Sequence, residues 1–68
     1  MIEFELSTEY IELIKLLKLL QLVESGGQAK MVVDDGWVKL NGEVEFRKRA
    51  KIRVGDIVDF DGQQILIK

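Results

Sequence analysis

The sequence contains no cysteine and no histidine among its 68 residues. Disulfide bonds and the common zinc-ligand sets are therefore excluded, and apolar packing must stabilise the fold. No apolar run approaches the roughly 18 residues that a membrane-spanning helix needs. The first ten residues, MIEFELSTEY, are acidic and lack the basic region of a secretory signal peptide. We therefore expect a soluble, cytoplasmic protein that forms one domain over residues 1–68, without a metal or a cofactor.

Positive charge is scarce overall but concentrated in one part of the chain. Ten Lys and Arg stand against twelve Asp and Glu, which gives a formal net charge of −2. Five of the ten cations fall within residues 47–53, here called the basic segment: Arg47, Lys48, Arg49, Lys51 and Arg53. Residues 30–53 hold seven basic and four acidic groups, whereas the two flanking parts of the chain are net acidic. An anionic partner would be attracted to the middle of the chain and repelled by the rest.

Hydrophobic periodicity predicts one strand and then a helix at the start of the chain. Apolar residues alternate with glutamates over residues 1–6, which is typical of a strand with one face in water. Residues 9–24 carry a wide apolar stripe at helical spacing. Ser7 or Thr8 could provide the N-cap of this helix.

A second, shorter helix of about ten residues is expected to follow. Ser25 and Gln28 form a capping-box pattern at its start, and Gly36 is well placed to end it. The glycines at positions 26 and 27 would let the chain turn sharply between the two helices.

The rest of the chain has strand patterns. Asn41-Gly42 divides residues 37–46 into a hairpin, and Asp61-Gly62 joins residues 51–60 to residues 63–68 in a second hairpin. A Gly-Asp pair at 55–56 would bend the strand over residues 51–60. The pattern predicts an α+β fold in which two N-terminal helices pack on a small, mostly antiparallel sheet.

The chain resembles the S4 RNA-binding domain, a family named after a ribosomal small-subunit protein. The resemblance extends over residues 9–60 and follows the order of the family's alpha-L motif. It is carried by Ser25, Gln28, Ala29, Lys30, Gly36, Val38, Leu40, Asn41, Gly42, Arg47, Gly55 and Asp56. Small free-standing bacterial members of the YbcJ type look most alike. The resemblance implies an alpha-L fold that binds structured RNA, often ribosomal RNA.

The resemblance also implies where RNA would be contacted, namely at the second helix and at the segment after the Asn-Gly turn. The positions that carry over are Gln28, Lys30, Arg47, Lys48, Arg49 and Lys51. Many family members have a basic residue where Gly26 stands, and basic or neutral residues where Asp34 and Asp35 stand. The two carboxylates confine the expected contact surface to the N-terminal half of the helix.

The alternative to ligand binding is that the basic segment is a solvated loop whose charges keep the protein in solution. The density of positive charge in this segment of an acidic chain favours phosphate binding instead, because planar guanidinium groups donate paired hydrogen bonds to phosphate.

Other residues have competing structural explanations. Arg53 could equally face solvent beside the sheet, and Ser25 is better explained as a helix cap than as a ligand. Trp37 could stack on a base, although covering a helix end or a sheet edge is the favoured interpretation. The other aromatic residues are expected in the core: Phe4, Tyr10, Phe46 and Phe60.

Catalytic chemistry has little support in the sequence. Without histidine or cysteine there is no standard pair of nucleophile and base. The aspartate clusters at 34–35 and 56–61 fall at a predicted helix end and at turns, where Asp serves local hydrogen bonding. We expect a non-enzyme that recognises structured, ribosomal RNA by backbone charge and shape, with a second contact to a ribosomal or other protein.

A protein-interaction adaptor or homodimerisation module is the alternative function. Its anchor would be the apolar stripe of the first helix: Leu16, Leu17, Leu19 and Leu20. An RNA binder should respond to salt and to charge reversal at Arg47 and Arg49, whereas an adaptor should respond to changes in this stripe.

Overall fold

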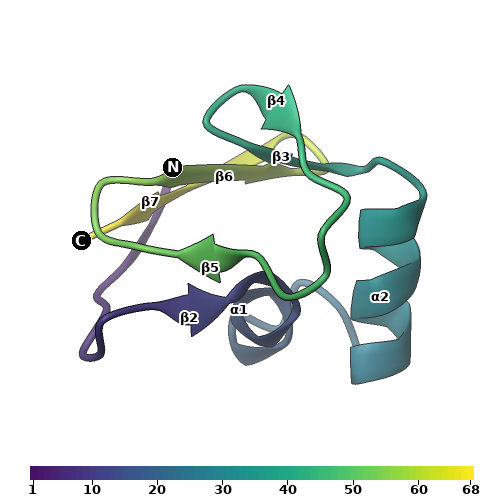
Figure 1. Ribbon diagram of the computed structural model, residues 1–68, viewed down its shortest axis with the longest axis horizontal. Helices are drawn as coiled ribbons and strands as arrows, with labels where there is room; N and C mark the ends of the chain where they lie inside the picture. The colour runs from purple at the N-terminus through teal and green to yellow at the C-terminus, as the bar shows by residue number, and fades with distance from the viewer.

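Two helices and two β-sheets make up the fold of the computed structural model, which describes all 68 residues (Figure 1). In chain order the elements are β1 (Ile2–Phe4), β2 (Ile11–Glu12), α1 (Leu13–Leu19), α2 (Gly26–Asp34), β3 (Val38–Leu40), β4 (Glu43–Val44), β5 (Lys51–Ile52), β6 (Ile57–Phe60) and β7 (Gln63–Ile67). Five strands form one sheet in the order β1-β7-β6-β3-β4, in which only the β1–β7 pair is parallel. The prediction of an α+β fold with two helices and a mostly antiparallel sheet is confirmed.

A second, two-stranded sheet lies below the large one in Figure 1 and carries the basic segment. It pairs β2 with β5 in antiparallel register, so that Ile11 lies opposite Ile52 and Glu12 opposite Lys51. The core between the layers consists of apolar side chains alone, with no buried polar group. Its twelve members come from both helices, both sheets and two connecting segments: Leu13, Leu16, Leu17, Val23, Ala29, Val33, Val38, Ala50, Ile52, Val58, Ile65 and Ile67.

The first helix is much shorter than the apolar stripe predicts. Ile11 and Glu12 are extended because they pair with β5, and Gln21 adopts a left-handed conformation, with φ of 58°, just after the helix. The predicted N-cap at Ser7 or Thr8 is wrong, since Glu12 is the N-cap residue and makes no side-chain cap bond. Only seven of the sixteen residues from 9 to 24 are therefore helical.

The second helix begins and ends as predicted. The Ser25 hydroxyl oxygen accepts a 3.1 Å hydrogen bond from the Gln28 N–H, and Gly36 follows the helix with a positive φ of 81°. The predicted role of Gly26 and Gly27 is wrong, because both belong to the first turn of α2 rather than to the link between the helices.

Both predicted hairpin turns are present. Asn41-Gly42 has φ values of 51° and 89°, and Asp61-Gly62 has 52° and 80°. Positive φ at both central residues is the geometry of a type I′ turn. The single bent strand predicted over residues 51–60 is instead two strands in different sheets, which separate at Gly55 with φ of 95°.

Candidate nucleic-acid interface

The basic segment is held against the start of α1 by its own backbone. The Leu13 N–H donates to the Ala50 carbonyl at 2.9 Å, and the Ile14 N–H donates to the Lys48 carbonyl at 3.2 Å. These donors belong to the first turn of the helix, where N–H groups have no partner within the helix. The segment thus caps α1 in place of a side chain, and its path is fixed by that cap.

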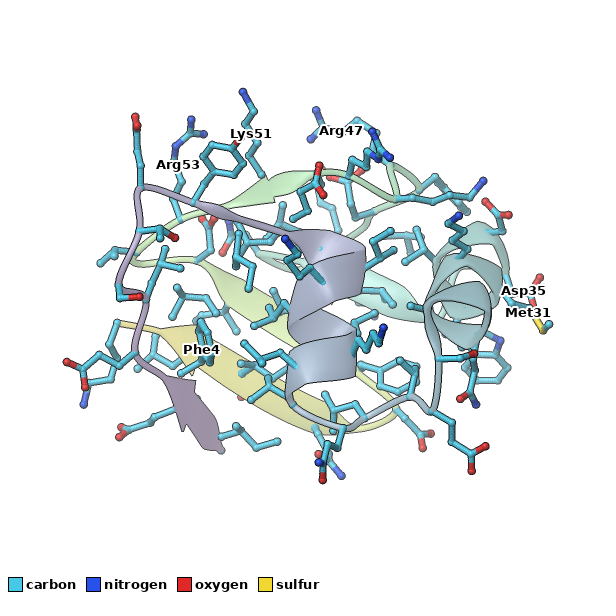
Figure 2. The ribbon with its side chains drawn as sticks, turned by 90° about the horizontal axis from the view of Figure 1, so that it is seen from below. Phe4, Met31, Asp35, Arg47, Lys51 and Arg53 are labelled. Atoms are coloured by element: carbon cyan, nitrogen blue, oxygen red, sulfur yellow. The ribbon has the colours of Figure 1, made fainter.

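Side chains alternate between inside and outside along the second half of the basic segment. Ala50 and Ile52 are buried in the core, whereas Arg49, Lys51 and Arg53 are exposed. Alternate residues of an extended chain point to the same side, so Lys51 and Arg53 share one outward face. Arg49 lies in the turn before β5, which the Ala50 N–H closes on the Arg47 carbonyl at 3.2 Å, and it lines the same hollow as Lys51 and Arg53. None of the three takes part in an ion pair with the protein's own carboxylates. Figure 2 shows Lys51 and Arg53 projecting from the same side of the molecule.

Tyr10 lies on this same outward face, beside two of the cations. The Lys51 Nζ atom is 5.0 Å from the centre of the Tyr10 ring, and the Arg53 Cζ atom is 5.9 Å from it. Both distances fall within the range of cation–π attraction. The residue is 39% exposed, so its predicted place in the core is wrong. Ile11 fills the inward position of β2, and Tyr10 before it is therefore turned outward.

The predicted place of Phe46 in the core is also wrong, since this residue is 61% exposed. Its ring covers Gly36, where an added Cβ atom would lie 3.6 Å from the Phe46 Cε1 atom. Phe4 and Phe60 are partly buried and pack against the core, as predicted.

Arg47 is engaged by a neighbouring carboxylate. Its Nε atom donates to Glu45 Oε2 at 3.1 Å, and its Nη2 atom donates to Glu45 Oε1 at 2.9 Å. These hydrogen bonds lower the pKa of Glu45 and raise the pKa of Arg47 from their ordinary values. The Arg47 guanidinium, which would suit a phosphate, is thus already hydrogen-bonded to Glu45, whereas the sequence suggested that it would be unpaired.

Lys48 connects the basic segment to α2. Its Nζ atom lies 3.1 Å from Asp34 Oδ1. Lys30 and Asp34 are four residues apart on the helix and so lie on one face of it. The face that carries Lys30 therefore adjoins the basic segment. Figure 2 shows Asp35 and Met31 pointing away from the side that carries Arg47 and Lys51.

The remaining candidate residues have mainly structural contacts. The Gln28 side-chain oxygen accepts a 2.6 Å hydrogen bond from the Glu24 N–H, which leaves only its amide NH₂ group for a ligand. The backbone N–H of Trp37 donates a 3.0 Å hydrogen bond to the Val32 carbonyl at the end of α2. The Trp37 ring is largely exposed beside Val32 and Phe60.

The basic side chains surround an open hollow of about 490 Å³, lined by Arg47, Arg49, Ala50, Lys51 and Arg53. No group of three acidic side chains is arranged to hold a metal ion, and neither helix has the length and apolar character needed to cross a membrane. The hollow has the cationic lining that a phosphate group requires.

The S4 domain family matches residues 4–68 of the chain. YbcJ of Escherichia coli (strain K12) is 47% identical over 58 residues, which cover 85% of this chain and 83% of YbcJ. The "Probable ribosome maturation protein RlbA" of Bacillus subtilis (strain 168) is 39% identical over 57 residues, covering 84% of this chain and 80% of RlbA.

Solved structures agree with the sequence matches. The solution structure of E. coli YbcJ, described as revealing an alpha-L motif involved in RNA binding, matches with a TM-score of 0.74 and 44% identity over 98% of this chain and 86% of that chain. The ribosomal protein S4e of Thermoplasma acidophilum shares the fold, with a TM-score of 0.70 at 19% identity over 85% of this chain and 31% of that chain. The predicted resemblance is confirmed, and the chain belongs to the S4 domain family.

Proposed function

We propose that the protein binds structured RNA, in particular ribosomal RNA, through a surface that we call the basic face: Lys30, Arg49, Lys51 and Arg53. The observation that carries the proposal is the set of three exposed, unpaired cations at alternating positions of the basic segment. YbcJ, similar over most of its length, is described as having a motif involved in RNA binding, and RlbA is named for ribosome maturation. Those two descriptions support the RNA and ribosomal parts of the proposal respectively.

Binding would depend on phosphate contacts and on shape rather than on base sequence. Contacts from Arg and Lys to phosphate fix the position of a protein on a nucleic acid without reading its sequence. Arg47 and Lys48 would join the basic face by exchanging their carboxylate partners for phosphates. The exchange costs little for Lys48, because its pair with Asp34 is exposed on both sides and exposed ion pairs contribute little to stability. It costs more for Arg47, because its partner Glu45 is only 13% exposed. The role is a non-enzymatic one in the cytoplasm.

Salt dependence tests the RNA-binding part. Four phosphate contacts predict a slope of about −3 to −4 when the logarithm of the affinity for a folded RNA is plotted against that of salt concentration. Arg49→Gln and Lys51→Gln should each make the slope shallower by about 1. Lys39→Gln is the matched control, because Lys39 is exposed on β3 and points away from the core side that carries the basic segment. Equal effects of all three changes would contradict the basic face.

Crosslinking in cells tests the ribosomal part. Ultraviolet crosslinking of the intact protein, followed by sequencing of the attached RNA, should recover ribosomal RNA enriched over transfer and messenger RNA. The enrichment should fall in the Arg49→Gln variant at equal protein level. Recovery of RNA classes in proportion to their abundance would contradict a ribosomal target while leaving RNA binding in place.

A further inference from the structure

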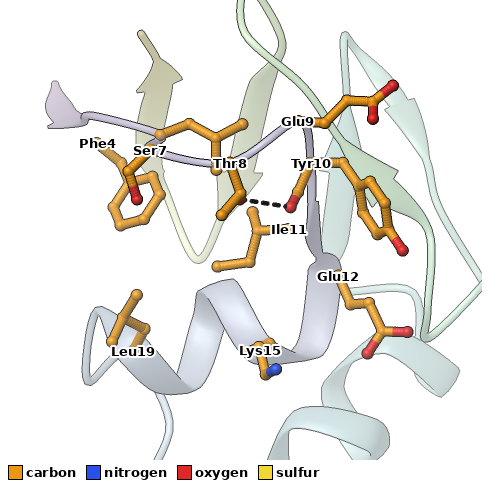
Figure 3. Close-up of a pocket in the computed structure, with 10 residues that line it drawn as sticks. Phe4, Ser7, Thr8, Glu9, Tyr10, Ile11, Glu12, Lys15 and Leu19 are labelled. Atoms are coloured by element: carbon orange, nitrogen blue, oxygen red, sulfur yellow. Dashed lines mark hydrogen bonds between the residues drawn. The ribbon is translucent and has the colours of Figure 1, made fainter.

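Tyr10 stands at the boundary between two hollows of different chemistry. On one side are Lys51 and Arg53, which contact its ring and line the basic hollow. On the other side Tyr10 borders a larger hollow of about 630 Å³ between α1 and the link from β1 to β2 (Figure 3). Its lining combines apolar and polar side chains: Phe4, Leu6, Ser7, Thr8, Glu9, Ile11, Glu12, Lys15 and Leu19. The Tyr10 ring itself projects away from the larger hollow (Figure 3) and lies beside the two cations, and the residue is 39% exposed.

The ring is held in position before any ligand binds. Tyr10 precedes β2, whose register on β5 is fixed, and the two cations sit 5.0 Å and 5.9 Å from the ring centre. A tyrosine has few side-chain torsions, so stacking a base on it costs little conformational entropy. In single-stranded nucleic-acid complexes, stacking on an aromatic side chain contributes about 1–3 kcal/mol per base.

The distances match the dimensions of one nucleotide. Only a sugar separates a base from its own phosphate, and a phosphate bound by Lys51 and Arg53 would lie within a side chain's length of the Tyr10 ring. A base that is paired inside a helix cannot stack on a protein ring, because both of its faces are covered by neighbouring bases. The base that meets Tyr10 must therefore be unpaired.

We infer that Tyr10 is a stacking site for a single unpaired nucleotide, and that the preferred RNA is a helix interrupted by a bulge next to the phosphates on the basic face. This inference rests on the proposed function and extends it, because it specifies which feature of the RNA is recognised. It makes Tyr10 a binding residue, whereas phosphate contacts alone would not distinguish a bulged helix from a regular one.

Two RNA duplexes of equal length test the inference, one fully paired and one with a single bulged 2-aminopurine. The wild-type protein should bind the bulged duplex about tenfold more tightly, as expected for one stacked base. Binding should also quench the 2-aminopurine fluorescence. Tyr10→Phe should keep both effects, and Tyr10→Leu should lose both, so that this variant binds the bulged and the paired duplex equally.

Tyr10 is the only tyrosine, so its ring signals in NMR spectra offer a test that needs no variant. These signals should move upfield on addition of the bulged duplex and stay in place with the paired one. Equal wild-type affinity for both duplexes, or a bulge preference that survives in folded Tyr10→Leu, would overturn the inference and leave RNA binding intact. Absence of binding to either duplex would instead overturn the proposed function itself.

Discussion

The side-chain amide of Asn41 donates a 3.0 Å hydrogen bond to the carboxylate of Asp56, fifteen residues further along the chain. The Asn41 side-chain oxygen accepts from the Ile57 N–H at 2.9 Å, and the second Asp56 oxygen accepts from the Arg53 N–H at 2.8 Å. The first hairpin turn is thereby tied to the reversal between β5 and β6. These two motif residues thus position the end of the basic segment through their side-chain hydrogen bonds.

Replacing Asn41 by glycine should destabilise the protein by about 1–2 kcal/mol, because two side-chain hydrogen bonds are lost. Glycine is chosen because it accepts the positive φ of this position without strain. Asp61→Gly is the matched control, since Asp61 has a similar φ of 52° in the other hairpin turn but makes no side-chain hydrogen bond. Urea denaturation of both variants measures the difference, and equal stabilities would contradict a structural role for the Asn41–Asp56 bridge.

Glu45→Gln should strengthen RNA binding. The change removes a negative charge and weakens the hold on the Arg47 guanidinium, which then becomes available to a phosphate. The affinity at low salt should rise about two- to fivefold, and the salt slope should steepen by about 1. Glu43→Gln, an equal change of charge at an exposed position of β4 that does not contact Arg47, should have a smaller effect. Identical gains in the two variants would mean that net charge alone is responsible.

The same ion pair predicts a pH dependence of stability. The Arg47 hydrogen bond lowers the pKa of Glu45 below its ordinary value of 4.5 in the folded state. The stabilisation from the pair is therefore complete above pH 4.5, and it is lost as the pH falls through the lowered pKa. Denaturation of the wild type and of Glu45→Gln at pH 7 and at pH 3 should show that the stability advantage of the wild type is smaller at pH 3 than at pH 7. A difference that persists unchanged at pH 3 would contradict this assignment.

Local signals predicted the parts of the fold that depend on short-range chemistry. The Asn41-Gly42 and Asp61-Gly62 turns and the Ser25 cap each follow from two or three adjacent residues. The β2 strand could not be predicted in this way, because its apolar Ile11 also fits the helical stripe of residues 9–24. Its extended form comes from pairing with β5, about forty residues away. Long-range pairing overrode the local pattern.

The sequence predicted which cations form the candidate site, but it did not predict which residues of the protein these cations contact. The density of positive charge identifies the basic segment, and the alternation of Lys51 and Arg53 with the buried Ala50 and Ile52 is visible in the sequence once an extended conformation is assumed. The contact of Lys48 with Asp34 depends on how the segment packs on α2. The exposure of Tyr10 depends on the same β2–β5 pairing that shortened the helix, so one missed strand accounts for both errors.

The burial of the apolar stripe of α1 helps to distinguish the two functions considered from the sequence, RNA binding and a protein-interaction adaptor. Leu16 and Leu17 are fully buried, so most of the anchor proposed for an adaptor belongs to the protein's own core, and only Leu19 is largely exposed, at 59%. Leu16→Gln should therefore destabilise the fold by about 3 kcal/mol or more, because it places an amide without partners in an apolar core.

Leu19→Gln makes the same chemical change at the exposed position of the helix. It should leave the circular dichroism spectrum, the sedimentation behaviour and the affinity for paired RNA unchanged, because this side chain lies outside both the core and the basic face. Sedimentation over a range of concentrations with both the wild type and this variant provides the measurement. A wild-type dimer that dissociates in Leu19→Gln, with RNA binding unaffected, would favour a self-association role for α1, since a core residue could not produce that result without unfolding.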